Sequence, residues 1–240
     1  MADYLDQVSE FVADTGFDNL PNAAIERARR VIVDTIAAIA AGSVEPEVVA
    51  LTTRMATQEG PSSVIGTGRC TLPATAAFLN GTSGTFLELD EGNQFSRGHP
   101  GVHALPSALA VAEDQKASGQ AFLTAIVLGY EVGARIGIAA KILPTMHPHG
   151  TWGTVGSAIA VAKLMGANAS QVRELINITS TLGLATSRQT MLQGGTVRNT
   201  FAGFSGQIGI MAWDMLESGF TGEADGLTTI WGKVISTEWR

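Results

Sequence analysis

Residues 121–143 read AFLTAIVLGYEVGARIGIAAKIL, and this stretch decides the fold class of the 240-residue chain. Ser118, just before it, is a residue type that favours the N-cap of a helix. Gly129, Gly133 and Gly137 are spaced four residues apart and so share one face of that helix. A face without side chains allows a second helix to approach closely. The stretch therefore predicts a long central helix, from residue 118 to about residue 143, in a tightly packed helical protein.

The same stretch contains three ionisable side chains, Glu131, Arg135 and Lys141. Each would cost about 3 kcal/mol in the middle of a lipid bilayer, which favours a buried helix over a membrane span. The N-terminal residues 1–7 include acids where a signal peptide needs basic residues. We therefore expect a cytoplasmic protein with no membrane partner.

Apolar residues recur at helical spacing along most of the remaining chain, which predicts helices nearly throughout. The exception is an extended piece at residues 62–65, which the pattern pairs with residues 69–72 in a hairpin. The predicted fold is all-α, a multi-helix bundle forming one domain over residues 1–240, with at most a short β-hairpin near residues 62–72. The expected helices cover about residues 4–16, 21–42, 46–58, 73–89, 107–116, 118–143, 151–165, 170–182 and 200–217.

The composition excludes several classes of protein. Charged residues make up only 15% of the chain and hydrophobic residues 45%, which argues against disorder. A net charge of −7 without a basic run argues against nucleic-acid binding. The single cysteine, Cys70, excludes an intrachain disulfide and a paired-cysteine zinc motif.

Three carboxylates lie close together at the start of a segment, residues 90–106, that has no helical period. Glu88, Asp90 and Glu91 fall within four residues, and mutual repulsion with burial would raise their pKa values toward the range of general acids and bases. His99 follows in the same segment and would complete an acid–base pair. The alternative is a solvated acidic helix end followed by a flexible turn.

A second irregular segment, residues 146–151, carries His147 and His149 on either side of a proline. Two imidazoles before a helix N-terminus would suit an anion, and an exposed polar turn is the alternative. A metal site would have to combine these two histidines with His99 and His103. No local spacing such as HExxH supports that combination, so we predict no metal.

A third candidate is the glycine-rich bend at residues 194–199, which places Arg198 immediately before a helix. Arg198 would clamp a carboxylate, or it would be a solvated cation. A helix N-terminus repels cations, which favours a functional role. Phosphate-binding and dinucleotide-binding glycine motifs and a nucleophile elbow are absent from the sequence, so covalent catalysis has no support.

Taken together, these segments resemble the MmgE/PrpD family, which includes 2-methylcitrate dehydratases, cis-aconitate decarboxylases and iminodisuccinate epimerases. The resemblance runs in order along nearly the whole chain. Its motifs are NGTSGTFLELDE at residues 80–91, His99-Pro100-Gly101, residues 119–137, His147-Pro148, Gly153-Thr154-x-Gly156-Ser157-Ala158 and residues 203–222.

The resemblance implies a cofactor-free enzyme with a helical domain and a smaller α/β lid domain, usually a homodimer, that handles small di- or tricarboxylates. Members of the family are much longer than this chain, so we expect the lid domain to be absent from it. The partners implied are a small carboxylate substrate, a second copy of the chain, and a separately encoded lid-domain subunit.

By the same resemblance, Asp90, His99 and His147 are the catalytic residues, and Arg198, Glu88 and Glu91 bind substrate. The family has aspartate where this chain has Glu88 and Glu91, and lysine where it has Arg198. Arginine keeps the charge but cannot release a proton.

The reaction implied is a 2-methylcitrate dehydratase-like elimination, begun by removing a proton next to a carboxylate. The alternatives are an epimerase of an iminodisuccinate-like substrate, or a non-catalytic half that needs a separate lid-domain chain.

Overall fold

The predicted central helix forms as α6 (Gly119–Ala139) in the computed structural model, which describes residues 3–240. Ser118 caps it, because its hydroxyl accepts a hydrogen bond from the backbone N–H of Ala121 at 3.1 Å. Gly129 and Gly133 lie against α7 (Gly153–Leu164), and Gly137 lies against Ser96 and Trp152. A Cβ atom on Gly129 would lie only 2.6 Å from the carbonyl oxygen of Gly156. The prediction of close packing through these glycines is therefore confirmed.

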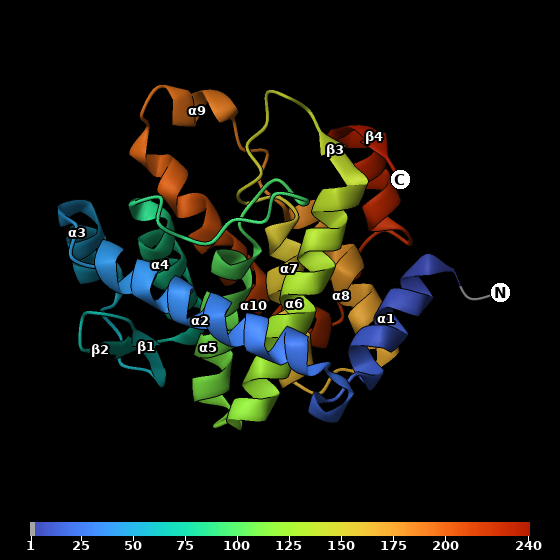
Figure 1. The fold of residues 1–240 in the computed structure, drawn as a ribbon, viewed down its shortest axis with the longest axis horizontal. Coiled ribbons are helices and arrows are strands. Elements are labelled where there is room, and N and C mark those ends of the chain that lie inside the picture. Colours follow the sequence, from blue (N-terminus) through green and yellow to red (C-terminus); the bar gives the residue numbers. More distant parts are fainter. Residues whose placement is uncertain (1–2) are drawn as a thin grey trace.

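The remaining helices surround this pair (Figure 1). They are α1 (Tyr4–Asp14), α2 (Asn22–Gly42), α3 (Pro46–Met55), α4 (Pro73–Phe86), α5 (Pro100–Asp114), α8 (Ala169–Leu182), α9 (Arg188–Leu192) and α10 (Thr200–Glu217). Short 3-10 turns cover Phe17–Asn19 and Thr196–Asn199, and a π-helical segment covers Leu227–Val234. The all-α prediction is confirmed.

Four short strands complete the described chain. The predicted hairpin forms between β1 (Ser62–Val64) and β2 (Arg69–Thr71), with Ser63 opposite Cys70. A second antiparallel pair, which the sequence did not predict, joins β3 (Ala140–Ile142) to β4 (Ser236–Trp239). The prediction that the helix continues to residue 143 is wrong over β3. There the backbone pairs with a segment almost a hundred residues away, and this pairing replaces helical hydrogen bonds.

The start of α5 also differs from the prediction. Residues 90–106 were expected to be a loop, but the helix begins at Pro100 and contains Pro106. A proline at the first helical position is favourable, because its missing N–H has no helical acceptor there. A proline inside a helix is normally unfavourable, which is why the pattern placed the helix start after Pro106. The irregular segment is therefore shorter than predicted and ends at His99.

By length and composition, α6 is the one helix within residues 3–240 that could cross a membrane. In the structure, 61% of its most apolar window is buried inside the fold. Its Leu128 belongs to the same buried core cluster as Trp152 and Trp231, and each of the three is at most 1% exposed. Here α6 serves as a core helix, with Glu131 and Arg135 paired with each other at 2.6 Å on its outer side.

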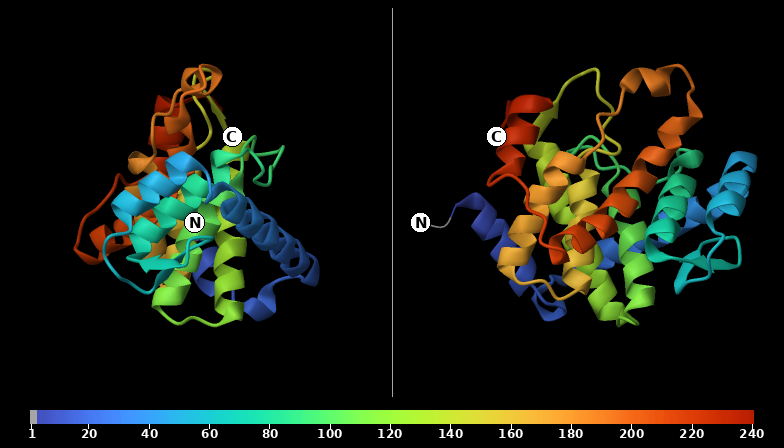
Figure 2. Two further views of the ribbon diagram at one scale, coloured as in Figure 1. Left: turned by 90° about the vertical axis from the view of Figure 1, so that its left-hand side faces the viewer. Right: turned by 180° about the vertical axis from the view of Figure 1, so that it is seen from behind.

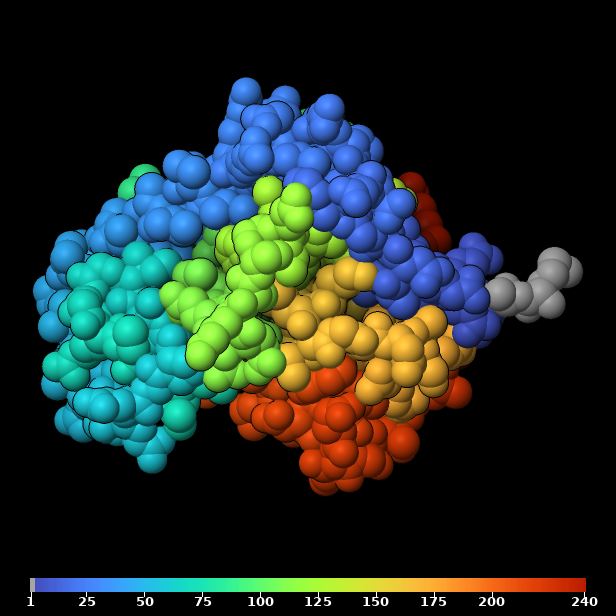
Figure 3. All heavy atoms as spheres, turned by 90° about the horizontal axis from the view of Figure 1, so that it is seen from below, coloured from blue at the N-terminus to red at the C-terminus, as the bar shows by residue number. Residues whose placement is uncertain are grey.

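The two ends of the bundle are built differently. The segments that precede α5 and α7 lie at the upper side in Figure 1, and from behind they run between α9 and the C-terminal residues (Figure 2). The opposite face, seen from below in Figure 3, is formed by residues of about 20–80, 105–125, 160–180 and 205–220. All the irregular segments singled out in the sequence therefore converge on one end.

Candidate functional site

The structure brings all four histidines of the chain into one cluster. His149 lies at its centre, with ring-centroid distances of 4.8 Å to His99, 5.2 Å to His103 and 4.7 Å to His147. Each pair meets edge to face, at interplanar angles of 84° to 86°. The local spacing gave no sign of this cluster, since its members come from two segments about 50 residues apart.

Local structure explains how the rings are placed. His99 is the N-cap residue of α5 and His103 follows one turn later, so both side chains lie on one face of that helix. The segment with His147 and His149 is held by Thr186, whose hydroxyl donates to both of their carbonyl oxygens at 2.7 and 2.9 Å. His147 and His149 are only 5% and 1% exposed, so the alternative of an exposed polar turn is wrong.

His99 and Asp90 form the predicted acid–base pair. The Nδ1 atom of His99 lies 3.0 Å from Oδ2 of Asp90, whose side chain is completely buried. The hydrogen bond to Asp90 is the main cause that raises the pKa of His99 above its usual value. The alternative of a solvated acidic end is therefore wrong for Asp90. His99 keeps its proton over a wider pH range than a free histidine does.

Glu91 lies behind this pair. One of its carboxylate oxygens accepts a hydrogen bond from the backbone N–H of Gly101 at 2.6 Å, and Tyr130 approaches the other at 3.4 Å. Burial raises the pKa of Glu91. Glu91 thus holds the first turn of α5, next to His99.

The other three histidines are neutral. Burial is the main cause that lowers the pKa of His147 to about 4 and that of His103 to about 3, and it places the pKa of His149 well below the usual value. The backbone N–H of His149 donates to Nδ1 of His147 at 3.1 Å. A neutral His147 must then carry its proton on Nε2, which makes that nitrogen a hydrogen-bond donor.

Arg198 is buried next to the cluster, at 5% exposure, so the alternative of a solvated cation is wrong. Its guanidinium donates to the carbonyl oxygen of Thr85 at 3.2 Å and to the side chain of Asn199 at 3.0 Å. It also pairs with Glu88, with Nη2 and Oε2 2.8 Å apart. Its charge contributes to lowering the pKa values of His103, His147 and His149.

Glu88 differs from Asp90 in its surroundings. Its side chain is 59% exposed, and its backbone has a φ of 56°, in the left-handed region that few non-glycine residues adopt. Two of the three positions where this chain departs from the family's residue type, Glu88 and Arg198, are thus in contact with each other.

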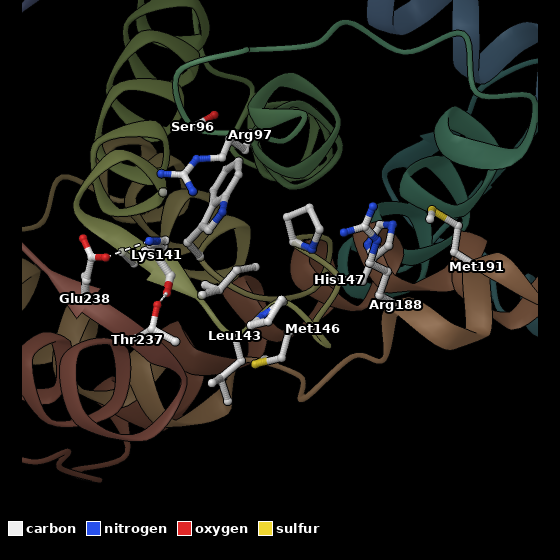
Figure 4. Close-up of a pocket in the computed structure, with 16 residues that line it drawn as sticks. Ser96, Arg97, Lys141, Leu143, Met146, His147, Arg188, Met191, Thr237 and Glu238 are labelled. Carbon is white, nitrogen blue, oxygen red and sulfur yellow. Dashed lines mark hydrogen bonds and ion pairs between the residues drawn. The ribbon is translucent and has the colours of Figure 1, made fainter.

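A cavity of about 740 Å³ opens beside the cluster (Figure 4). It is bordered by His147 and Trp152, but not by Asp90, His99 or Arg198. Three cationic residues line it, and sequence reasoning missed all of them: Arg97, Lys141 and Arg188. They come from distant segments and belong to no motif, so only the fold brings them together.

The cations of the cavity are not equivalent. Lys141 pairs with Glu238 at 2.7 Å, whereas Arg97 and Arg188 have no ion pair among residues 3–240. Figure 4 shows Arg188 beside His147, and its charge contributes to lowering the pKa of that histidine. The cavity is therefore positively charged on the side that borders the histidine cluster.

The arrangement can bind a carboxylate and move a proton. Arg198 and Arg188 supply positive charge, His147 supplies a neutral donor, and the pair of His99 and Asp90 holds an exchangeable proton. Asp90, His99 and His149 are also side chains of the kinds that hold divalent metals.

Fold and site together define an all-α protein with a buried histidine–carboxylate centre and a buried arginine. The chain belongs to the MmgE/PrpD family: the family profile for the MmgE/PrpD N-terminal domain matches residues 6–236.

Curated relatives are longer than the chain. It is 29% identical over 221 residues to the cis-aconitate decarboxylase-like protein oryM of Aspergillus oryzae, covering 85% of this chain and 45% of that protein. It is 26% identical over 227 residues to the cis-aconitate decarboxylase of Aspergillus terreus, covering 89% and 46%. It is 31% identical over 171 residues to the cis-aconitate decarboxylase of Homo sapiens, covering 67% and 35%. The chain thus spans less than half the length of these relatives.

Proposed function

We propose that this chain is the helical part of a lyase that acts on a small di- or tricarboxylate by moving a proton next to a carboxylate group. The observation that carries the proposal is the pair of His99 and buried Asp90, set beside three neutral histidines and Arg198. The names of the curated relatives, which are cis-aconitate decarboxylases, support the same reaction class.

Substrate binding would use Arg198 first. A carboxylate that reaches the cluster meets a buried guanidinium whose acidic partner, Glu88, is largely exposed. Glu88 can turn toward water at little cost, whereas Arg198 is held by Thr85 and Asn199. Nε2–H of His147 would add a neutral donor to the same anion. Fixed donors of this kind stabilise negative charge as it develops in a reaction.

Proton transfer would then use His99. In a decarboxylation, the bond from carbon to the departing CO2 breaks, its electron pair stays on the substrate carbon, and His99 supplies the proton that completes the product. In a dehydration, a base instead removes the proton next to a carboxylate and hydroxide leaves. In an epimerisation, that proton returns to the opposite face.

We favour decarboxylation within this class, because the curated relatives carry that name and because Asp90 raises the pKa of His99, which favours a proton donor at this position. Dehydration of a 2-methylcitrate-like acid is the second candidate, which the family resemblance supports.

The proposed activity also depends on protein outside this chain. The chain spans less than half of its relatives, so we expect activity to require residues outside it, in a lid domain of the kind that the family resemblance implies. We also propose a homodimer of the helical part, for which analytical ultracentrifugation is the direct measurement. A chain that folds and binds tricarboxylates but never turns them over, with or without a lid-domain chain, would be a non-catalytic half.

The test is proton NMR in D2O with the chain alone and mixed with a lid-domain chain. Cis-aconitate and 2-methylcitrate are supplied separately. Decarboxylation of cis-aconitate produces a new pair of vinyl signals and releases CO2. Dehydration of 2-methylcitrate to 2-methylaconitate turns the methyl doublet into a methyl singlet on a double bond, without CO2. Epimerisation produces deuterium exchange without a new product.

The matched variants are Asp90→Asn and, as control, Asp34→Asn on the exposed side of α2. Asp90→Asn is expected to lower kcat/KM by about 100-fold, the usual size of a general acid–base contribution. Equal activity of both variants, or no reaction with any acid while tricarboxylates still bind, would rule the proposal out.

A further inference from the structure

The histidine cluster has a property that the proposed proton transfer does not use. Both ring nitrogens of His103 and of His149 are buried without a hydrogen-bond partner among residues 3–240. Leaving a buried polar group unpaired costs about 1–3 kcal/mol. Native proteins seldom contain such groups unless a water, an ion or a ligand uses them.

Ligand atoms of three side chains converge at this place. One nitrogen of His99, one nitrogen of His149 and one carboxylate oxygen of Asp90 all lie within 4.8 Å of one another. A tetrahedral zinc ion with bonds of about 2.1 Å holds its ligand atoms about 3.4 Å apart. The 3.0 Å between His99 and Asp90 is already near that value, so closing the site requires His149 to shift by roughly 1 Å.

The charges also suit a cation. Imidazole binds metals through a nitrogen lone pair, and no residue among 3–240 occupies the ring nitrogens of His149. Asp90 supplies a buried negative charge with Glu91 next to it, and the opposing charge of Arg198 is balanced by Glu88.

We infer that Asp90, His99 and His149 form a binding site for a divalent transition metal, with Zn²⁺ as the best fit to two imidazoles and one carboxylate. Two histidines and one carboxylate around an open fourth position are a common donor set for zinc. All three residues lie on this chain, so the site needs no lid domain. A bound ion would also occupy the nitrogen and oxygen atoms through which His99 and Asp90 exchange a proton, so zinc is expected to inhibit the proposed reaction.

The experiment titrates the metal-free chain with Zn²⁺ by isothermal calorimetry, and with Co²⁺ by visible absorption. The expected result is one ion per chain and a Co²⁺ spectrum with the strong absorption of a four-coordinate site. Asp90→Asn and His149→Gln should each weaken Zn²⁺ binding by at least about tenfold. The control Asp34→Asn should bind as the wild type does.

A second measurement on the wild type covers the case in which both variants fail to fold. Imidazole ¹⁵N resonances are followed by NMR during the Zn²⁺ titration. Shifts at His99 and His149 at one equivalent support the site. Absence of binding, or binding that leaves these resonances unchanged or persists in both folded variants, overturns it. The readout is metal binding and not turnover, so its failure leaves the proposed lyase untouched.

Discussion

Two regions of the bundle differ in how their interior is filled: the contact between the glycine-lined helices α4 and α10, and the histidine cluster. Where α4 meets α10, a Cβ atom on Gly203 would lie 2.3 Å from the carbonyl oxygen of Phe78, so no space is left for another atom. At the histidine cluster, in contrast, buried nitrogens have no partner within the described chain. The first region has no room for another atom, and the second leaves buried polar atoms without a partner among residues 3–240.

The largest expected effect is a loss of stability when atoms are added at the contact between α4 and α10. Gly203→Val should lower the free energy of unfolding by about 3 kcal/mol or more, because its side chain meets the backbone of α4 and Thr82. Urea unfolding followed by circular dichroism measures this. The control is Gly119→Ala at the start of α6, where a Cβ would meet nothing within 4 Å. A Gly203→Val protein as stable as the control would show that the helices can separate without cost.

Acid should destabilise the fold through the histidine cluster. The unfolded chain takes up protons at His103 and His147 near pH 6.5, whereas the folded chain does so only near their lowered pKa values of about 3 and about 4. Stability therefore falls as the pH drops below about 6.5, by about 1.4 kcal/mol per pH unit for each such proton. His149 acts in the same direction.

His99 has the opposite sign. Its raised pKa contributes stability that is lost as the pH rises through that pKa, so it does not cancel the acid effect. Urea titrations between about pH 7 and about pH 5 test this. A constant free energy of unfolding over that interval would show that the histidines are not neutral in the folded state.

Replacing Arg198, the buried cation, should weaken the binding of carboxylates. Arg198→Gln is expected to lower the affinity for tricarballylate, an unreactive tricarboxylate, by about 100-fold, in the range for loss of a buried charge pair. Calorimetry measures the affinity. Arg29→Gln is the matched control, since Arg29 forms an exposed pair with Glu26 on α2. Unchanged affinity in Arg198→Gln would exclude Arg198 as the carboxylate clamp.

Asp90→Asn should lower the pKa of His99, because the hydrogen bond to Asp90 is the main cause that raises it. An NMR titration of the His99 imidazole reports this pKa without any turnover, and Asp34→Asn again serves as the control. If the pKa of His99 stays the same, the pair seen in the structure does not control its protonation.

The smallest effect, with the opposite sign, is expected at Glu88. Glu88→Gln removes the exposed acid that occupies Arg198, so tricarballylate should bind up to about fivefold more tightly, the upper range for an exposed ion pair. Glu59→Gln on the exposed surface is the control. Weaker binding in Glu88→Gln would mean that Glu88 helps to hold the substrate and does not compete with it.

Most of the fold could be predicted from the sequence because its signals are local. Helical spacing, the cap at Ser118 and the glycines that face α7 depend on residues a few positions apart. The hairpin of β1 and β2 was predicted for the same reason. The strand β3 was missed because the segment with which it pairs lies at the far end of the described chain.

The candidate site was predicted only in part. Asp90, His99 and Arg198 were found from charge patterns and family motifs, but the sequence left open whether they are buried or solvated. His149 was considered only as an anion-binding imidazole beside His147, His103 was assigned no role, and the cavity residues Arg97, Lys141 and Arg188 were missed.

The sequence by itself determined that the chain folds as a helical bundle of the MmgE/PrpD family, because helix formation and close packing at glycines depend on residues a few positions apart. Only the tertiary structure decided that four histidines meet, that Arg198 is buried against Glu88, and that β3 leaves the helix. Burial and long-range proximity set pKa values and ligand geometry, and neither can be read from the spacing of residues along a chain.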